Sequence, residues 1–96
     1  MRAIVIGAGG EEGRDLVHRL ARGGAFVLAV DLDRAAAGHT AATAPGGTVI
    51  PHGADAARPR EWAAVRNRAI ALWGGVDEIL DPEGVRATPR SAAPRP

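Results

Sequence analysis

Apolar residues follow two patterns along the chain. Short unbroken apolar runs, typical of strands buried on both faces of a parallel sheet, alternate with longer stretches in which apolar residues recur at helical spacing. The runs Ala3–Ile6 and Ala25–Val30 predict two buried strands. Thr48–Ile50 predicts a brief third strand, and the more polar segment Val76–Leu80 predicts a fourth.

Three helices are predicted between these strands. The first begins inside a glycine-rich turn and ends at Gly23, where a glycine pair stops the apolar stripe. Asp33 is expected to cap a short alanine-rich helix. Pro59 is expected to be the first residue of the third helix, which ends at Gly74. The predicted apolar stripe of this third helix, which faces the core or a partner, consists of Trp62, Val65, Ala69, Leu72 and Trp73.

The alternation of four strands with three helices predicts an α/β fold. With right-handed crossovers it gives half of a doubly wound Rossmann sheet, with parallel strands in the order 3-2-1-4. Residues 1–82 are expected to form this single domain. Residues 83–96 are rich in proline, alanine and arginine and lack periodicity, so we predict a disordered C-terminal tail.

Composition narrows the classes of function. The 12 arginines and 11 acidic residues are spread along the 96-residue chain, so no nucleic-acid partner is expected. The chain has no cysteine, and its three histidines lack the spacing of a helical metal pair, so no metal site is expected. No apolar run approaches the roughly 20 residues of a membrane span, and no signal-peptide layout is present. We therefore expect a cytoplasmic protein without a membrane partner.

The glycine-rich turn and a distant acid carry the strongest signal for function. Gly7, Gly9, Gly10 and Gly13 lie between the first predicted strand and helix, and Asp31 ends the second strand. A strand, glycine turn, helix and strand with an acid about 20 residues on is the layout of a dinucleotide-binding unit.

Four segments in order resemble the N-terminal cofactor-binding half of the short-chain dehydrogenases/reductases, over about residues 2–84. Gly7–Gly13 is similar to the family's TGxxxGxG turn or its GxxGxxG variant, and Asp31 matches its acid. Gly53–Trp62 is similar to the stretch that enters the next helix, and Gly74–Leu80 to the strand that follows.

The resemblance implies a dinucleotide partner. In the family the turn holds the pyrophosphate, the acid at Asp31 binds the adenosine ribose, and the acid at Asp55 contacts adenine. It implies NAD as the cofactor in preference to NADP, because a 2′-phosphate would face the Asp31 carboxylate, which Arg34 offsets only partly. The implied cofactor-binding residues are Gly7, Gly9, Gly10, Gly13, Asp31, Asp55 and Ala56.

Glu11 and Glu12 depart from the family's turn, where glycine and an apolar residue are usual. In one interpretation these acids complement the helix dipole and occupy the anion position themselves. In the other, pyrophosphate binding persists, although each like-charge contact costs up to roughly 3 kcal/mol. The sequence leaves both open.

The residues of the family's catalytic step have no counterpart here. Asp81-Pro82-Glu83-Gly84 stands where the family has N-N-A-G, and the catalytic serine, tyrosine and lysine lie beyond that motif. This chain contains no tyrosine and no lysine, and its single serine is Ser91. We therefore predict no catalytic residue and a truncated module that is inactive alone, with at most weak NAD(H) binding.

Two alternatives remain beside this prediction. In the first, the chain is a structural or interaction remnant without a ligand. In the second, it is one piece of a split oxidoreductase, completed by a partner chain that carries tyrosine and lysine. The fourth predicted strand would be an exposed sheet edge. Such an edge favours a protein partner or self-association.

Overall fold

A computed structural model describes residues 1–86, and residues 87–96 of the predicted disordered tail lie outside the described part. The elements follow the predicted order of strands and helices, which is confirmed. They are β1 (Arg2–Ile6), α1 (Glu11–Arg22), β2 (Phe26–Asp31), α2 (Arg34–Ala42), β3 (Thr48–Gly53), α3 (Pro59–Trp73) and β4 (Glu78–Leu80). Within residues 1–86, none of the helices has the length and apolar character needed to cross a membrane.

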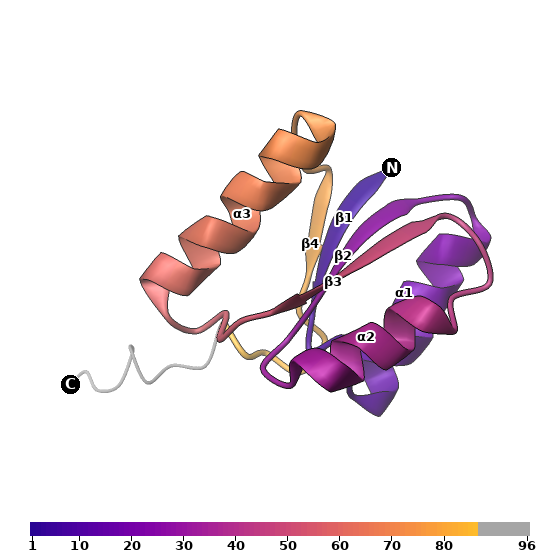
Figure 1. The fold of residues 1–96 in the computed structure, drawn as a ribbon, viewed down its shortest axis with the longest axis horizontal. Helices are drawn as coiled ribbons and strands as arrows, with labels where there is room; N and C mark the ends of the chain where they lie inside the picture. Colours follow the sequence, from indigo (N-terminus) through magenta and orange to yellow (C-terminus); the bar gives the residue numbers. More distant parts are fainter. Residues whose placement is uncertain (87–96) are drawn as a thin grey trace.

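The four strands form one parallel sheet in the order β3-β2-β1-β4, as predicted. Ile4 at the centre of β1 pairs with Leu28 of β2 on one side and with Ile79 of β4 on the other. Helices α1 and α2 cover one face of the sheet, and α3 covers the opposite face (Figure 1). The sheet is therefore the middle of three layers.

The strands point alternate side chains to the two faces, which makes two buried layers. Trp62 and Val65 of α3 meet one set of strand residues, and Val17 of α1 meets the other. The layer under α3 contains Ile4, Ile6, Leu28 and Val30, and the layer under α1 contains Val5, Val27 and Ala29. Both faces of β1 and β2 are thus covered, which explains their unbroken apolar runs.

Local sequence signals mark the start of α2 and both ends of α3, as the sequence predicts. The Asp33 carboxylate accepts hydrogen bonds from the N–H groups of Ala35 (3.0 Å) and Ala36 (3.2 Å), so it caps α2. Pro59 is the first residue of α3. Gly74 follows α3 with a φ of 80°, a left-handed conformation that suits glycine.

The bounds of two strands differ from the predictions. Strand β3 continues through Pro51 to Gly53, where a loop was predicted, because an edge strand can place proline on its unpaired side. Strand β4 begins at Glu78 rather than Val76. In the apolar stripe of α3, Trp62, Val65 and Ala69 are buried, whereas Leu72 is 42% exposed.

Residues 83–86 do not behave as part of a disordered tail. The side chain of Val85 packs against the layer under α3, and the guanidinium of Arg86 lies 4.4 Å from the ring centroid of Trp62. The backbone N–H groups of Val85 and Arg86 both donate to the Asp81 carboxylate, each at 2.8 Å. The packed part of the chain therefore extends beyond the predicted boundary at residue 82.

Candidate functional site

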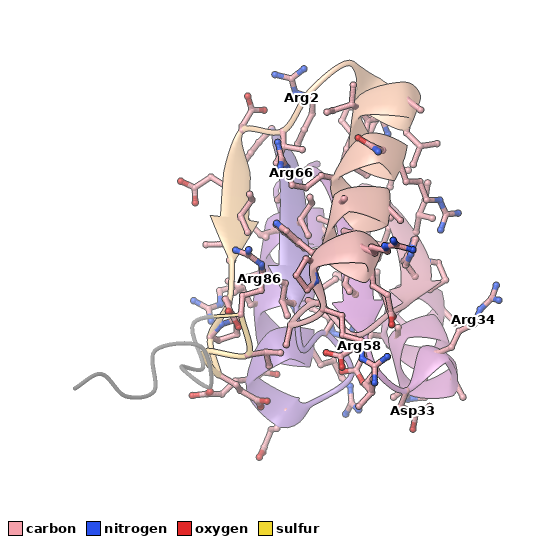
Figure 2. All side chains as sticks on the ribbon, turned by 90° about the vertical axis from the view of Figure 1, so that its left-hand side faces the viewer. Arg2, Asp33, Arg34, Arg58, Arg66 and Arg86 are labelled. Carbon is pink, nitrogen blue, oxygen red and sulfur yellow. The ribbon has the colours of Figure 1, made fainter. Side chains whose placement is uncertain are left out.

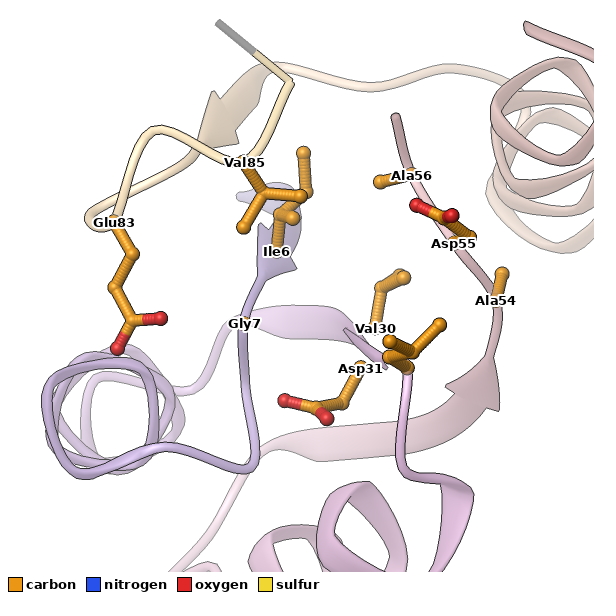
Figure 3. Close-up of a pocket in the computed structure, with 10 residues that line it drawn as sticks. Ile6, Gly7, Val30, Asp31, Ala54, Asp55, Ala56, Glu83 and Val85 are labelled. Atoms are coloured by element: carbon orange, nitrogen blue, oxygen red, sulfur yellow. The ribbon is translucent and has the colours of Figure 1, made fainter. Parts of the chain in front are cut away.

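A cavity of about 190 Å³ lies at the carboxyl ends of the strands. Its walls come from all four strand ends (Figure 3): Ile6 and Gly7 at the end of β1, residues 30–32 at the end of β2, residues 54–56 after β3, and Glu83 with Val85 after β4. In open parallel sheets, ligands bind outside the carboxyl ends where the strand order reverses. Here the order reverses at β1, between β2 and β4, which is where this cavity lies.

The glycine turn joins β1 to α1 in a tight bend. Gly7 has a φ of 80°, and the N–H groups of Gly7 and Ala8 both donate to the Val30 carbonyl, at 2.8 and 2.9 Å. Gly10 is the residue before α1 and has no side chain to bind the N–H groups of the first helical turn. These N–H groups lie on the positive end of the helix dipole, which favours an anion.

Asp31 braces the turn from the end of β2. Its Oδ2 accepts a hydrogen bond from the Gly9 N–H (2.8 Å), and its Oδ1 accepts one from the Asp33 N–H (2.8 Å). A carboxylate oxygen has two lone pairs, so each oxygen of Asp31 retains the capacity for a further hydrogen bond. Asp31 thus has a structural role and is still able to accept from a ligand hydroxyl.

Asp55 and Ala56 form the wall of the cavity after β3. The Asp55 carboxylate accepts from the Ala57 N–H (3.0 Å) and lies 3.5 Å from Nε of Arg58. The Asp55 N–H donates to the carboxylate of Glu61 in the first turn of α3 (2.7 Å). The Asp55 side chain keeps 32% of its surface exposed, whereas Ala56 is 3% exposed and belongs to the core. Of the predicted cofactor-binding residues, Gly7, Asp31, Asp55 and Ala56 line this cavity, whereas Gly9, Gly10 and Gly13 are not among its lining residues.

Arginines lie at the glycine turn and near the strand ends: the Arg14 guanidinium donates to the Gly9 carbonyl at 3.2 Å. Arg34 and Arg58 lie near the carboxyl ends of the strands, away from Arg2 at the opposite end (Figure 2). Burial first, and then the nearby charges of Arg68 and Arg34, lower the pKa of His52. The Arg68 guanidinium donates to Nδ1 of His52 at 2.9 Å, which requires a neutral ring.

Glu83 is the residue at the site that the sequence analysis missed. Glu11 and Glu12 are both exposed at the start of α1, and the carboxylate that lies against the glycine turn is that of Glu83. Residue 83 falls in the segment that the sequence predicts as a disordered tail. The signal that would have found it is its place in Asp81-Pro82-Glu83-Gly84, since all carboxyl ends of a parallel sheet share one edge.

The adenosine part and the diphosphate part of a dinucleotide meet different surroundings at these residues. Around the cavity, Asp31 offers acceptors for hydroxyl groups, and Asp55 offers one for an amino group beside the apolar Ala56. At the turn, the Glu83 carboxylate lies beside Gly10, where it would repel a diphosphate, and the Arg14 guanidinium is bound to the Gly9 carbonyl. The residues therefore fit the adenosine half of a dinucleotide better than its diphosphate.

No protein-family model matches the chain, and no curated protein matches it significantly. Solved structures do match. A hydroxysteroid dehydrogenase from Escherichia coli is 30% identical with a TM-score of 0.77, over 81% of this chain and 33% of that one. A 3-ketoacyl-(acyl-carrier-protein) reductase from Brucella melitensis, complexed with NADH, is 32% identical with a TM-score of 0.76, over 81% and 32%.

A citronellol catabolism dehydrogenase from Pseudomonas aeruginosa is 27% identical with a TM-score of 0.78, over 82% of this chain and 34% of that one. The chain thus spans about a third of the length of each of these three proteins. All three are dehydrogenases or reductases by description, and one was solved with a bound dinucleotide.

Proposed function

Because the chain belongs to the short-chain dehydrogenase/reductase family and has the fold of its N-terminal cofactor-binding part, we propose that it is a dinucleotide-binding module with weak affinity for NAD(H). One observation carries this proposal. Gly7 of the glycine turn, Asp31, Asp55 and Ala56 line one cavity at the position where the strand order reverses.

The proposed mode of binding uses the adenosine end of the ligand. Asp31 would accept hydrogen bonds from the ribose hydroxyls with its remaining lone pairs, and Asp55 would accept one from the adenine amino group. The diphosphate would lie beside Gly10 at the start of α1. A bound nicotinamide supplies hydride chemistry. The chain has no tyrosine or lysine for the family's proton transfer, so we propose no activity for this chain by itself.

The proposed preference is for NAD(H) over NADP(H). The 2′-phosphate of NADP(H) would meet the Asp31 carboxylate at the ribose position, and like charges repel. Arg34 is exposed at the start of α2, so solvent screens its attraction for such a phosphate.

Calorimetric titration of the purified chain with NADH and NADPH tests this proposal. We expect a dissociation constant on the order of 1 mM for NADH and weaker binding of NADPH. Asp31→Asn should weaken NADH binding and reduce the discrimination between the two cofactors, with folding checked by circular dichroism. Asp15→Asn, an exposed change on α1 outside the cavity, is the matched control and should leave both affinities unchanged.

Two outcomes would contradict the proposal. One is the absence of binding at several millimolar NADH. The other is NADPH binding that is tighter than NADH binding, because the Asp31 carboxylate would then have no influence at the ribose.

A second candidate function rests on β4. Within residues 1–86 this strand pairs only with β1, and its central residue Ile79 is 47% exposed. In this alternative, a partner chain that carries tyrosine and lysine pairs with β4 and completes an oxidoreductase. A purified chain that remains monomeric in sedimentation velocity and binds NADH unaided favours the module over the two-chain enzyme.

A further inference from the structure

The carboxylate of Glu83 lies against the glycine turn. A Cβ atom placed on Gly10 would come within 3.0 Å of Oε2 of Glu83, and one placed on Gly7 within 3.6 Å of Oε1. Glu83 reaches this position from the loop after β4 and points toward the turn and the start of α1 (Figure 3). The two oxygens therefore border both glycines that flank the bend.

The loop that carries Glu83 is held from both sides. Before it, the Asp81 carboxylate accepts hydrogen bonds from the N–H groups of Val85 and Arg86, each at 2.8 Å. After it, Val85 packs against the core, and the guanidinium of Arg86 stacks over the ring of Trp62 at 4.4 Å. The position of Glu83 thus follows from the packing of its neighbours.

The charge at this position decides what the turn can accept. The start of a helix attracts an anion, and in a dinucleotide-binding unit that anion is the ligand's diphosphate. In this chain a negative charge of the protein already lies beside Gly10. An added diphosphate would be repelled by it, whereas the adenosine end of a ligand lies next to Asp31, Asp55 and Ala56 and carries no such charge.

We propose that Glu83 makes the cavity selective for adenosine ligands without phosphate and limits the affinity for dinucleotides. This inference rests on the proposed function, because both use the same adenosine position. Glu83 is exposed as a whole, so solvent screens part of the repulsion. We therefore expect an effect of about tenfold on a phosphate-bearing ligand rather than several powers of ten.

Titration of the full chain and of its Glu83→Gln variant with adenosine and ADP tests this inference. Glu83→Gln keeps the shape of the side chain and removes the charge, and its exposed position should leave the fold intact. We expect the affinity for ADP to rise about tenfold at low salt, and the gain to shrink at about 0.5 M salt. The affinity for adenosine should stay within about twofold of the unmodified chain.

Glu11→Gln is the matched control, because it removes one exposed carboxylate from the start of the same helix. It should raise the ADP affinity less than Glu83→Gln does. Equal ADP affinity in the unmodified chain and the Glu83→Gln variant, while adenosine binds both, would overturn the role of Glu83 alone. The same gain from Glu11→Gln would also overturn it. Failure of adenosine, ADP and NADH to bind any of the three proteins would overturn the proposed function as well.

Discussion

The four glycines of the turn have different neighbours. Gly7 adopts a positive φ, and Gly9 has no room for a Cβ beside Ala36 and the Asp31 carboxylate. Gly10 faces Glu83, whereas a Cβ on Gly13 would overlap the carbonyl oxygen of Gly7. Gly7, Gly9 and Gly13 are therefore required by backbone conformation or close packing, whereas the nearest neighbour of a Cβ on Gly10 is the Glu83 carboxylate.

Gly13→Ala should be strongly destabilising for this reason. The added methyl group would force α1 away from the end of β1, and such overpacking costs about 1–3 kcal/mol of unfolding free energy. Gly38→Ala in α2 is the matched control, because no atom lies within 4 Å of its added methyl group. Since alanine favours helix, this control should be stabilised by up to about 1 kcal/mol. Urea denaturation measures both, and a Gly13→Ala variant as stable as the unmodified chain would contradict the close packing.

Among the strands, β4 has the shortest pairing, with three residue pairs to β1. Asp77, the residue before β4, contacts the start of β1. The Asp77 carboxylate accepts hydrogen bonds from the backbone N–H of Arg2 (2.8 Å) and from its guanidinium (2.8 and 3.1 Å). The Asp77 N–H in turn donates to the Arg2 carbonyl at 2.8 Å. Reciprocal hydrogen bonds between Arg2 and Asp77 thus join the start of β1 to the start of β4, which gives Asp77 a structural role.

Asp77→Asn should lower the stability of the protein by an amount that depends on pH. Hydrogen bonds from the side chain and backbone of Arg2 hold the pKa of Asp77 well below its ordinary value of 3.8. The folded state therefore favours the carboxylate, and the stabilisation is present at neutral pH and is lost as the pH falls below that ordinary value. The melting temperature of the variant should be lower at pH 7, and the difference should shrink toward pH 2.

Glu78→Gln is the control for this pair, because the Glu78 side chain is exposed on β4 and forms no hydrogen bond within residues 1–86. It should change the melting temperature less than Asp77→Asn at neutral pH. A difference between Asp77→Asn and the unmodified chain that stays constant from pH 7 to pH 2 would show that the ionised contact contributes nothing.

Over the whole molecule, apolar runs, glycines and right-handed crossovers were sufficient to predict the element order and the sheet order. Two structural features were not predicted from the sequence, because contacts between residues far apart in the chain determine them. Pro51 and His52 have the composition of a loop, but pairing with β2 makes them strand. Residues 83–86 have the composition of a tail, but Val85 and the two hydrogen bonds to Asp81 order them. The place of Glu83 just after the fourth strand puts it at the carboxyl edge of the sheet, but its position against the glycine turn follows from these long-range contacts.

The central claim is that an adenosine dinucleotide binds at the carboxyl ends of the strands. Amide NMR spectra recorded while NADH is added up to several millimolar test it most directly, because they locate the bound ligand. The largest shifts should fall on the amides of Gly7, Asp31 and Ala56, which line the cavity, while Leu72 at the far end of α3 stays unchanged. Spectra without shifts at these three amides, or with shifts confined to β4, would contradict the claim.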